Sequence, residues 1–491
     1  MIRDLVVLCY GRNSPYDYDA HTPLSILALG TYLETKGLEV EYYDERLDAL
    51  TVFDAMLKRK PLLVGFSVIG GYQIVSSARL SRRVRELNAE TKIVWGGITP
   101  TTLARETIQE DFVDYVVTGE GEETLWELIR CLREGRAPES LTGLAHKTGG
   151  RPQVNPLRPS PDIESLPFVY QGKALEMLKR YLKIPAVREA VGYEGSRGCP
   201  FLCTFCYSPN FHANTRIKSP EKLAAELRAL HDLGVDRIDI YDDTLMGGRK
   251  SEIAGLAAEL RKNSLRWMAN LRINMLSPDL LASLEGSGCE WLYYGIESNR
   301  DDVLSVIKKG MNASSIEDGL KLMGRSSIPA VYSVIYGLPI EPAPDAEEVL
   351  AFAERIHELD PDAEVQVQSY VPLPGSDLYA NAVARGFKPP KNLLGWAEHD
   401  HFAVEDAWLR DPRLPRKLYL TSFMAFRYRR HLSSFPMSLA AFPLHLLSRW
   451  RIRQRAFGLY IENPLYHLFL AAARARNDFH FWLREKQSCA G

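Results

Sequence analysis

The sequence lacks several features that would assign the protein to a simple class. It has no stretch of about 18 uninterrupted apolar residues, which a membrane-spanning helix requires, and no low-complexity segment or short repeat. The apolar run at its N-terminus is short and broken by charge, unlike a secretory signal. Only seven cysteines occur in 491 residues. An odd cysteine count without an export signal predicts a cytoplasmic protein with reduced thiols and a metal site rather than a disulfide framework.

The overall charge and composition give little direct indication of function. The formal net charge is −2, with 46% hydrophobic and 25% charged residues, the balance of an ordinary globular protein. A charge this small gives no indication of a nucleic-acid partner. The length is too great for one ordinary core and predicts two or three domains.

Residues 1–140 alternate strand and helix patterns. Apolar runs predict strands over 5–10, 38–44, 61–68, 92–97 and 113–121, with helices over 24–36 and 74–87. Short strands that alternate with helices predict a parallel, doubly wound, Rossmann-like sheet. In such sheets ligands bind at the carboxyl ends of the strands. Small and turn-forming residues follow three strands, at 67–71, 96–100 and 118–122; taken alone, they favour ordinary turns between strand and helix.

A second strand–helix series occupies residues 189–385. A proline-rich connection with a helical piece at 172–183 precedes it, and we interpret residues 141–188 as a linker. The strand candidates are 190–196, 237–243, 266–273, 291–298, 330–339 and 364–373, and helical patterns lie at 220–233, 250–262, 278–286 and 345–358. Six units are too few for a closed eightfold barrel. The pattern predicts a partial (β/α)₆ barrel, followed by a mainly helical region over 386–491.

Three cysteines cluster after the first strand of the second series. Cys199, Cys203 and Cys206 lie in one short loop, where three thiolates can face one iron–sulfur cluster. A [4Fe–4S] cluster usually takes four cysteines, so three leave one iron open to another ligand, as in catalytic metal sites. The alternative is a zinc site without its fourth ligand, for which His212 is a lone candidate.

The spacing C-x₃-C-x₂-C, with Phe205 before the last cysteine, resembles the signature of the radical SAM enzymes. The resemblance implies that S-adenosylmethionine (SAM) chelates the open iron and that electron transfer cleaves it to a 5′-deoxyadenosyl radical. It also implies an external electron donor of the flavodoxin or ferredoxin type.

Further similarity to the radical SAM family lies at successive strand ends of the barrel. It implies SAM binding by Asp242, Asp243, Arg272, Glu297, Gly337 and Pro339. The segment 372–376 resembles the P-x-P-G-[TS] element of a radical SAM subgroup. The sequence departs from the family at 339–342, which read Pro-Ile-Glu-Pro where relatives more often have P-G-E-T.

The N-terminal domain resembles the cobalamin-binding domain that precedes the barrel in a large radical SAM subgroup. The matching stretches are 22–24, 65–73, 95–100 and 118–122. The resemblance implies cobalamin contacts by Ser67, Gly70, Gly71, Gln73, Gly96, Gly97, Thr99, Gly119, Glu120 and Gly121.

His21 is the residue to consider as a ligand of cobalt. Cobalamin domains that ligate cobalt through histidine carry D-x-H-x-x-G, but here Asp19-Ala20-His21 is followed by Thr22-Pro23-Leu24. The final glycine is missing, and Pro23 stiffens the chain. We therefore expect a cobalt without a protein imidazole, its lower face covered by the loop 68–73.

Residues 416–484 differ from the rest of the chain. They contain twelve Lys and Arg and two acidic residues, a net charge of +10, with interleaved aromatic residues. The first interpretation is a helical cap on the barrel with its arginines in solvent. A peripheral contact with the inner face of an anionic membrane is compatible with it. Nucleic acid is a third possibility, which we do not expect.

The leading functional hypothesis is a cobalamin-dependent radical SAM enzyme that uses a [4Fe–4S] cluster to functionalise an unactivated carbon. Methyl transfer through methylcobalamin to a large hydrophobic substrate, such as a lipid or tetrapyrrole, is its first form. A radical cyclase or rearrangement enzyme that uses cobalamin without methylating is the alternative within this class. The alternative from another class is an iron–sulfur and cobalamin sensor or electron carrier, against which the missing fourth cysteine argues.

Overall fold

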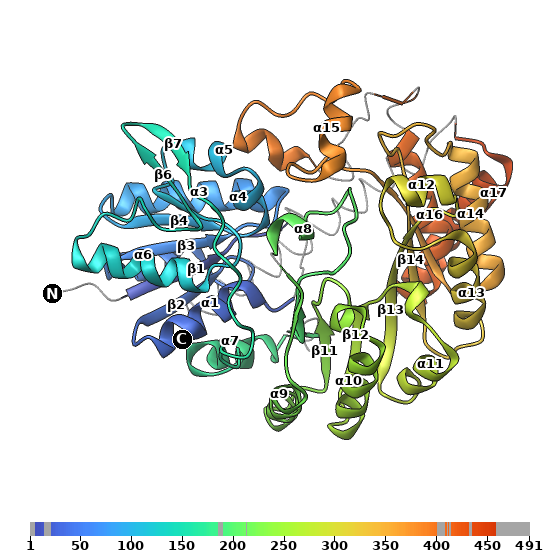
Figure 1. Ribbon diagram of the computed structural model, residues 1–491, viewed down its shortest axis with the longest axis horizontal. Helices are drawn as coiled ribbons and strands as arrows, with labels where there is room; N and C mark the ends of the chain where they lie inside the picture. The colour runs from blue at the N-terminus through green and yellow to red at the C-terminus, as the bar shows by residue number, and fades with distance from the viewer. Residues whose placement is uncertain are drawn as a thin grey trace.

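The computed structural model describes residues 5–13, 21–184, 190–212, 214–399, 408–409, 411, 414–431 and 435–457. Two α/β bodies lie side by side in it, with helices from the C-terminal part of the chain behind the second body (Figure 1). The predicted order of a Rossmann-like domain, a radical SAM-type barrel and a helical C-terminal region is confirmed. None of the helices in the described ranges combines the length and apolar character that a membrane span requires.

The first body is a seven-stranded sheet in the order β2-β1-β3-β4-β5-β6-β7. Its parallel part consists of β1 (Leu5–Tyr10), β2 (Glu39–Asp44), β3 (Leu63–Ser67), β4 (Lys92–Gly96) and β5 (Tyr115–Val117). The helices are α1 (Leu24–Thr35), α2 (Leu50–Lys58), α3 (Tyr72–Leu87), α4 (Ile98–Thr102), α5 (Ala104–Gln109) and α6 (Glu122–Glu134). The central strands are buried along their whole length, since helices cover both faces of a parallel sheet.

Residues 144–154 fall within the predicted irregular connection, yet they form a hairpin. Strands β6 (Leu144–Thr148) and β7 (Arg151–Val154) add to the edge of the first sheet, with β6 antiparallel to β5. Gly149 and Gly150 make the two-residue turn, both with positive φ, which is the backbone that tight hairpins need. The helix α7 (Gly172–Tyr181) also packs on this domain, against α1.

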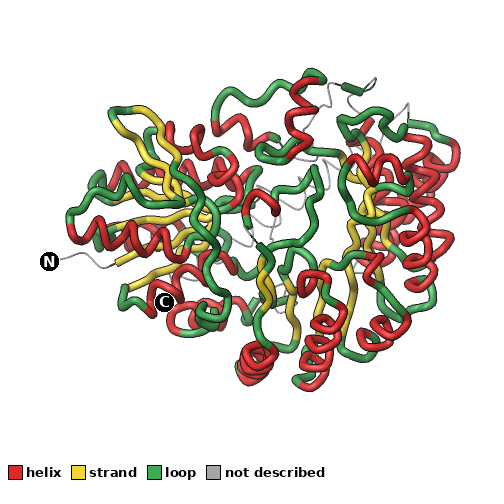
Figure 2. Tube along the Cα trace, in the orientation of Figure 1, coloured by secondary structure: helices red, strands yellow, loops and turns green. Residues whose placement is uncertain are grey.

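The second body is a six-stranded parallel sheet in the order β15-β14-β13-β12-β11-β8. Its curved strands line one side and its helices the other (Figure 2). The strands are β8 (Val191–Tyr193), β11 (Arg237–Ile240), β12 (Arg266–Asn270), β13 (Cys289–Glu297), β14 (Ala330–Tyr336) and β15 (Glu364–Ser369). The helices are α9 (Pro220–Asp232), η1 (Leu245–Gly248), α10 (Lys250–Lys262), η2 (Ile273–Met275), α11 (Pro278–Leu284), α12 (Asp301–Val306), α13 (Ala313–Met323) and α14 (Ala346–Leu359).

The loop that carries the three cysteines leaves and re-enters the barrel through a two-stranded ribbon. This ribbon pairs β9 (Ser196–Arg197) with β10 (Arg216–Ile217), and the short helix α8 (Ser208–Phe211) lies between them in the chain. Gly198 begins the loop with a φ of +82°, and a Cβ there would lie 2.4 Å from the carbonyl oxygen of Asn214. Glycine is therefore required where the two ends of the loop cross.

The C-terminal helices cover the last strand of the barrel. After α15 (Asp377–Ala384) and η3 (Leu393–Glu398), helix α16 (Leu414–His431) packs against β15, and α17 (Phe435–Gln454) packs against α16. The Ser422 side chain accepts a hydrogen bond of 3.1 Å from the Val367 N–H. The described part of the basic segment is thus a helical cap; the rest of 416–484, with Cys489, lies outside the described residues.

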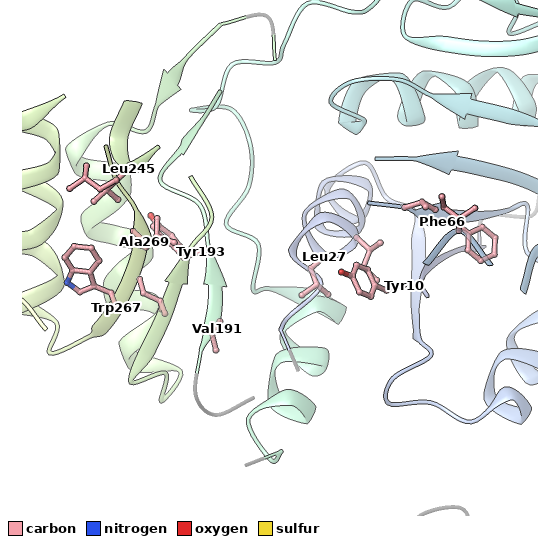
Figure 3. Close-up of a cluster of buried hydrophobic side chains, with 14 of the residues drawn as sticks. Tyr10, Leu27, Phe66, Val191, Tyr193, Leu245, Trp267 and Ala269 are labelled. Atoms are coloured by element: carbon pink, nitrogen blue, oxygen red, sulfur yellow. The ribbon is translucent and has the colours of Figure 1, made fainter. Parts of the chain in front are cut away.

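Apolar side chains fill the core of both bodies. Tyr10, Leu27 and Phe66 lie in the first domain, while Tyr193 and Trp267 lie in the barrel (Figure 3). The Trp267 indole is fully buried and donates hydrogen bonds to Ser287. These side chains belong to one apolar cluster that extends through both domains.

Candidate functional site

A cavity of about 550 Å³ lies where the carboxyl ends of the two sheets meet. Gly97 and Gly119, which follow β4 and β5, form part of one wall, while Glu194 and Asp243, which follow β8 and β11, form part of the other. Its volume is in the usual range for ligand pockets. Parallel sheets bind ligands at this edge, so the cavity is the natural ligand site of the first domain. Of the residues predicted to bind the cluster or SAM, only Asp243 lines it.

The wall contributed by the first domain is mostly backbone and apolar side chain. Gly97 has a φ of +99°, and a Cβ there would lie 2.7 Å from the Val68 carbonyl oxygen. Leu8 and Phe66 add apolar surface, and the Ser25 and Ser67 hydroxyls share a hydrogen bond of 2.9 Å. This wall is a smooth surface against which a large, flat ligand can lie.

Only part of the predicted cobalamin-binding set reaches the cavity. The residues on its wall are Ser67, Gly96, Gly97, Gly119, Glu120 and Gly121. Gly70, Gly71, Gln73 and Thr99 are not among the residues that line it.

Gln73 and Thr99 support the loop after β3 instead. The buried Gln73 side chain accepts a 2.7 Å hydrogen bond from the Ile69 N–H and donates to the Gly11 carbonyl. The Thr99 hydroxyl donates to the Ile69 carbonyl at 2.6 Å. These bonds hold Ile69, which is 51% exposed and lines the cavity, in place.

Two aromatic residues of the wall were not assigned to a site from the sequence. Tyr10, at the end of β1, and Tyr241, just after β11, both line the cavity. His21 also lies on the wall, with its ring centroid 6.3 Å from that of Tyr241. Its carbonyl accepts a 2.9 Å hydrogen bond from Arg46, which pairs with the buried Asp44. Their places at the carboxyl ends of β1 and β11 were the signal that could have indicated Tyr10 and Tyr241.

The three cysteines lie in one loop, and the Cys199 and Cys203 thiols are near enough to Cys206 to affect its pKa. Cys203 is buried, while Cys199 and Cys206 are partly exposed. The Cys206 sulfur accepts a hydrogen bond of 3.4 Å from the Ser208 N–H. Burial raises the pKa of Cys206 to about 11, although that N–H opposes the shift and the other two thiols add to it. Without metal, the Cys206 thiol is therefore protonated at neutral pH, and it loses its proton when it binds metal.

Arg272 and Phe201 close one side of the cysteine loop. The Arg272 guanidinium lies 3.6 Å from the centroid of the Phe201 ring, and its Nη1 is 4.0 Å from the Cys203 sulfur. Burial lowers the pKa of Arg272, and the nearby Cys203 and Cys199 sulfurs oppose this shift. A buried cation next to these thiols favours thiolates.

The two predicted acids after β11 have different environments. Asp242 is 1% exposed and accepts hydrogen bonds from three backbone N–H groups and the Ser196 hydroxyl. Its carboxylate is thus used to hold the start of the cysteine loop. Asp243 lines the cavity and accepts a 2.7 Å bond from the Ser208 hydroxyl, so it is the acid of the pair that faces the site.

Glu297 and Gly337 lie at the ends of β13 and β14. Glu297 pairs with Lys309 at 2.8 Å, accepts a bond from Ser333, and has a φ of +62°, an unusual backbone for a side-chain-bearing residue. Such strain is often stored at functional sites. The Gly337 carbonyl accepts a 2.9 Å bond from the Trp408 indole. Pro339 follows Leu338, whose carbonyl accepts a bond from the Ile340 N–H, and its role in SAM binding stays a prediction.

Family models match both halves of this site. The model described as the B12 binding domain matches residues 15–129, and that of the Radical SAM superfamily matches residues 193–353. The chain belongs to the cobalamin-binding radical SAM enzymes. Its cofactors are cobalamin, SAM and a [4Fe–4S] cluster, as in the rest of that family. Being a radical SAM enzyme, it also needs an external electron donor.

Similar proteins and structures agree with this family. An uncharacterized methyltransferase of Pyrococcus horikoshii is 28% identical over 419 residues, 82% of this chain and 88% of that protein. The anaerobic magnesium-protoporphyrin IX monomethyl ester cyclase of Synechocystis sp. is 28% identical over 317 residues, 62% of each chain. The structure of the radical SAM methyltransferase TsrM from Kitasatospora setae, with cobalamin and a [4Fe–4S] cluster bound, has a TM-score of 0.68 at 15% identity. It covers 91% of this chain and 99% of its own and supports the fold.

The residues present fit an iron–sulfur cluster better than zinc. In the described part of the chain no three His, Cys, Asp or Glu side chains come close enough to hold a single metal ion. A zinc ion needs its four ligands around one point, whereas cluster thiolates each bind a different iron and stand further apart. The side chain of His212 is also engaged, since its Nδ1 lies 3.0 Å from Glu120.

Proposed function

We propose that this radical SAM enzyme transfers a methyl group to an unactivated carbon of a large hydrophobic substrate. The observation that carries the proposal is the shared cavity. Gly97 and Gly119 of the cobalamin-binding domain line it together with Tyr207, the residue after Cys206. Cys199, Cys203 and Cys206 do not line the cavity themselves, but their neighbours Gly198 and Tyr207 do, so cofactors bound at the two sheet edges would lie close to the same cavity.

The chain itself holds and separates the reactants. Cys199, Cys203 and Cys206 hold the cluster, and Arg272 balances the charge of their thiolates. The glycine-rich wall would hold cobalamin by its shape, and Ile69, which Gln73 and Thr99 hold in place, would help to exclude water from it. When bound, these cofactors supply an electron for SAM cleavage and a transferable methyl group.

The names of two relatives support the proposed hydrophobic substrate. One relative is named as a methyltransferase, and another as a cyclase of a magnesium-protoporphyrin ester, a large apolar ring system. The cyclase keeps ring formation open as the second candidate function. A sensor or electron carrier is disfavoured because, in the described residues, the cysteine loop offers three thiols and no fourth ligand.

The test uses reconstituted enzyme with cobalamin, SAM labelled in its methyl group, a reduced flavodoxin as donor, and a panel of tetrapyrroles and polyprenoid lipids. A product that contains the labelled methyl, formed together with 5′-deoxyadenosine, supports methyl transfer. A product that loses hydrogen atoms and gains no label would instead establish the cyclase. Cleavage of SAM with no product from any apolar substrate would contradict a hydrophobic substrate.

A peripheral membrane contact is a further part of the proposal. Leu446 and Trp450 lie one turn apart on α17 and are 52% and 53% exposed, next to the exposed Arg453. An apolar pair beside a basic residue suits an anionic bilayer surface. Arg451 and Arg455 are unsuited to testing it, since Arg451 is 5% exposed and Arg455 pairs with Glu354.

Flotation with anionic vesicles at low salt tests this contact. Wild-type enzyme is expected to float, and the variant with Leu446→Ser, Trp450→Ser and Arg453→Gln to remain in solution. Val306→Ser, which removes an exposed apolar residue (46%) of the barrel, is the control. Equal flotation of both variants, or none for wild type, contradicts the contact.

A further inference from the structure

The ribbon of β9 and β10, here called the neck of the cysteine loop, carries two positive charges directly opposite each other. In the ribbon of β9 and β10, Arg197 is the partner of Arg216 in the antiparallel register. Like charges at opposed positions destabilise a ribbon, and strands of two residues each have little else to hold them together. Within the barrel, Glu194 accepts a hydrogen bond of 2.7 Å from Arg197, and the other domain supplies the rest of the counter-charge.

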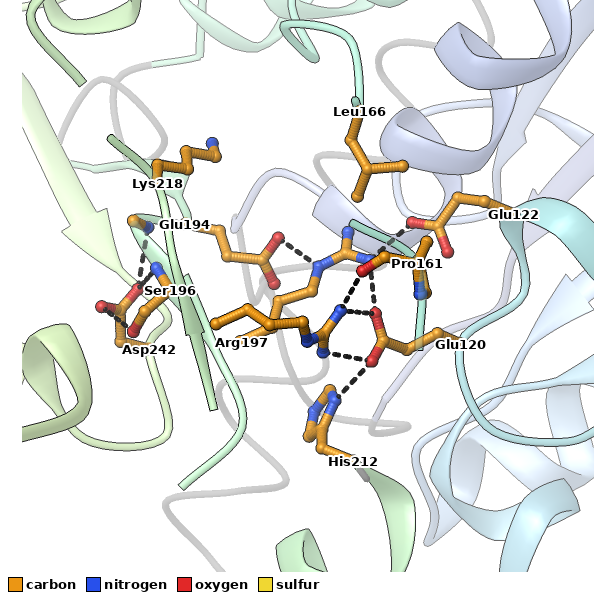
Figure 4. Close-up of polar contacts among 12 residues, drawn as sticks. Glu120, Glu122, Pro161, Leu166, Glu194, Ser196, Arg197, His212, Lys218 and Asp242 are labelled. Carbon is orange, nitrogen blue, oxygen red and sulfur yellow. Dashed lines mark hydrogen bonds and ion pairs between the residues drawn. The ribbon is translucent and has the colours of Figure 1, made fainter. Parts of the chain in front are cut away.

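The other domain supplies this counter-charge through Glu120. Its carboxylate accepts hydrogen bonds from Arg197 at 2.9 Å and from Arg216 at 3.1 Å (Figure 4). Glu122, also from the cobalamin-binding domain, accepts a second bond from Arg197 at 2.7 Å. The Glu120 side chain is 5% exposed, and those of Arg197 and Arg216 are 10% and 12% exposed. Charges this deeply buried depend on their partners.

Glu120 stays ionised in this environment. Burial alone would raise the pKa of Glu120, but hydrogen bonds from His212 and Arg216, together with the Arg197 charge, hold it well below its usual range. Its carboxylate is thus occupied by barrel residues, although the sequence assigned it to cobalamin.

A chain of contacts runs from Glu120 to a cysteine. His212 bridges Glu120, 3.0 Å from its Nδ1, and Asp243, 3.7 Å from its Nε2. Asp243 accepts a bond from the Ser208 hydroxyl, and the Ser208 N–H donates to the Cys206 sulfur. Both the neck and the far side of the loop are therefore connected to one carboxylate of the neighbouring domain.

We propose that Glu120 is a positioning residue that closes the neck of the cysteine loop from the cobalamin-binding domain. Docking of that domain then sets the geometry of the cluster loop and its distance from the cobalamin edge. The proposal rests on the assignment of Cys199, Cys203 and Cys206 as cluster ligands. Without Glu120 the enzyme still cleaves SAM, but it forms less product for each 5′-deoxyadenosine released, because the two cofactors are no longer held at the correct distance.

The test compares reconstituted full-length wild-type enzyme with Glu120→Gln. The readouts are iron content, the EPR spectrum of the reduced cluster with and without SAM, and product formed per 5′-deoxyadenosine. We expect iron to be retained, the EPR signal and its response to SAM to change, and the product ratio to fall about tenfold, since small misplacements of reacting groups are costly.

The barrel contains a matched control at its opposite end. Glu290 pairs with both Arg237 and Arg266, which are also opposed in neighbouring strands. Glu290→Gln breaks the same arrangement far from the site, and it should lower thermal stability without changing the EPR spectrum or the product ratio.

A second variant keeps the test decisive if Glu120→Gln folds poorly. Arg216→Gln removes one of the two opposed positive charges, so the neck needs less negative charge from Glu120. This variant alone should change the EPR spectrum only slightly. Combined with Glu120→Gln, it should restore the EPR spectrum toward that of wild type.

Two outcomes would overturn the role proposed for Glu120 while leaving the cluster assignment intact. One is an EPR spectrum and product ratio in Glu120→Gln that equal those of wild type. The other is a double variant, Glu120→Gln with Arg216→Gln, whose EPR spectrum stays as altered as that of Glu120→Gln. Absence of iron in the wild-type enzyme would overturn the cluster assignment as well.

Discussion

The two walls of the cavity expose different chemical groups. The cobalamin-binding domain presents backbone at Gly97 and Gly119 with apolar side chains, and carboxylates only where Glu120 and Glu122 meet the barrel, whereas the barrel presents ionic groups such as Arg197, His212 and Asp243. A wall of backbone atoms binds a ligand through its shape, so an added side-chain atom weakens binding. A wall of charged side chains depends on its ion pairs, so removal of one partner disturbs the others. Substitutions on the two sides should therefore have different consequences.

The largest effect is expected on the barrel side, where the cluster ligands lie. Replacing Cys199, Cys203 and Cys206 together by alanine should abolish both the cluster and SAM cleavage, because three thiolates are the chain's contribution to the metal. Iron analysis and 5′-deoxyadenosine release measure this. Single serine variants of Cys9, Cys131, Cys289 and Cys489 are the controls, and loss of the cluster in one of them contradicts the assignment.

The backbone wall is tested by adding one carbon atom. Gly97→Ala places a Cβ against the Val68 carbonyl at positive φ, which should cost about 1–3 kcal/mol of stability and weaken cobalamin binding on the order of tenfold. Gly71→Ala is the matched control, since its φ is +55° but nothing lies within 4 Å of the added carbon. Equal cobalamin affinity of the two variants, measured by absorbance titration, would show that the wall is not a contact surface.

The sequence defined the two domains but not how they meet. The alternation of strands and helices located all six barrel strands, and the cysteine spacing predicts the metal loop. Most predicted strands extended beyond the carboxyl ends of the observed strands; the prediction 237–243, for example, compares with β11 at Arg237–Ile240. The extra residues continue the strand pattern in the sequence, but in the structure they form the loops that follow the strands. The hairpin of β6 and β7 was signalled by Gly149-Gly150 and missed. The role of Glu120 could not be found, since its partners lie 77 and 96 residues away.

A smaller effect, on the pH dependence of the free energy of unfolding, is expected from the buried carboxyl group of Asp242. Burial raises the pKa of Asp242 to about 6, and hydrogen bonds from Ser196, Met246 and Gly195 limit the rise. Because the folded-state pKa lies above the unfolded value of 3.8, the neutral form favours folding. Stability from this group is fully present below about pH 4 and is lost as the pH rises through 6, by about 3 kcal/mol in total. Asp242→Asn should lack this slope in denaturant unfolding between those values; a slope equal to that of wild type contradicts the assignment.

The smallest effect is expected at His21. It lies on the backbone side of the cavity, yet the missing glycine of the ligand motif predicts that its imidazole does not bind cobalt. The Co(II) EPR spectrum of bound cobalamin should show no histidine nitrogen splitting and should be unchanged in His21→Ala. A nitrogen splitting that disappears in this variant would make His21 the lower ligand.

The central claim is that cobalamin and the cluster lie close to the same cavity. Reduced cluster and Co(II) cobalamin are both paramagnetic, so their magnetic interaction reports their proximity directly. Pulsed EPR of the doubly loaded enzyme should show dipolar broadening and faster relaxation of the Co(II) signal, and both should disappear in the variant with alanine at Cys199, Cys203 and Cys206. A Co(II) signal identical in the two proteins would place the cofactors apart and contradict the account.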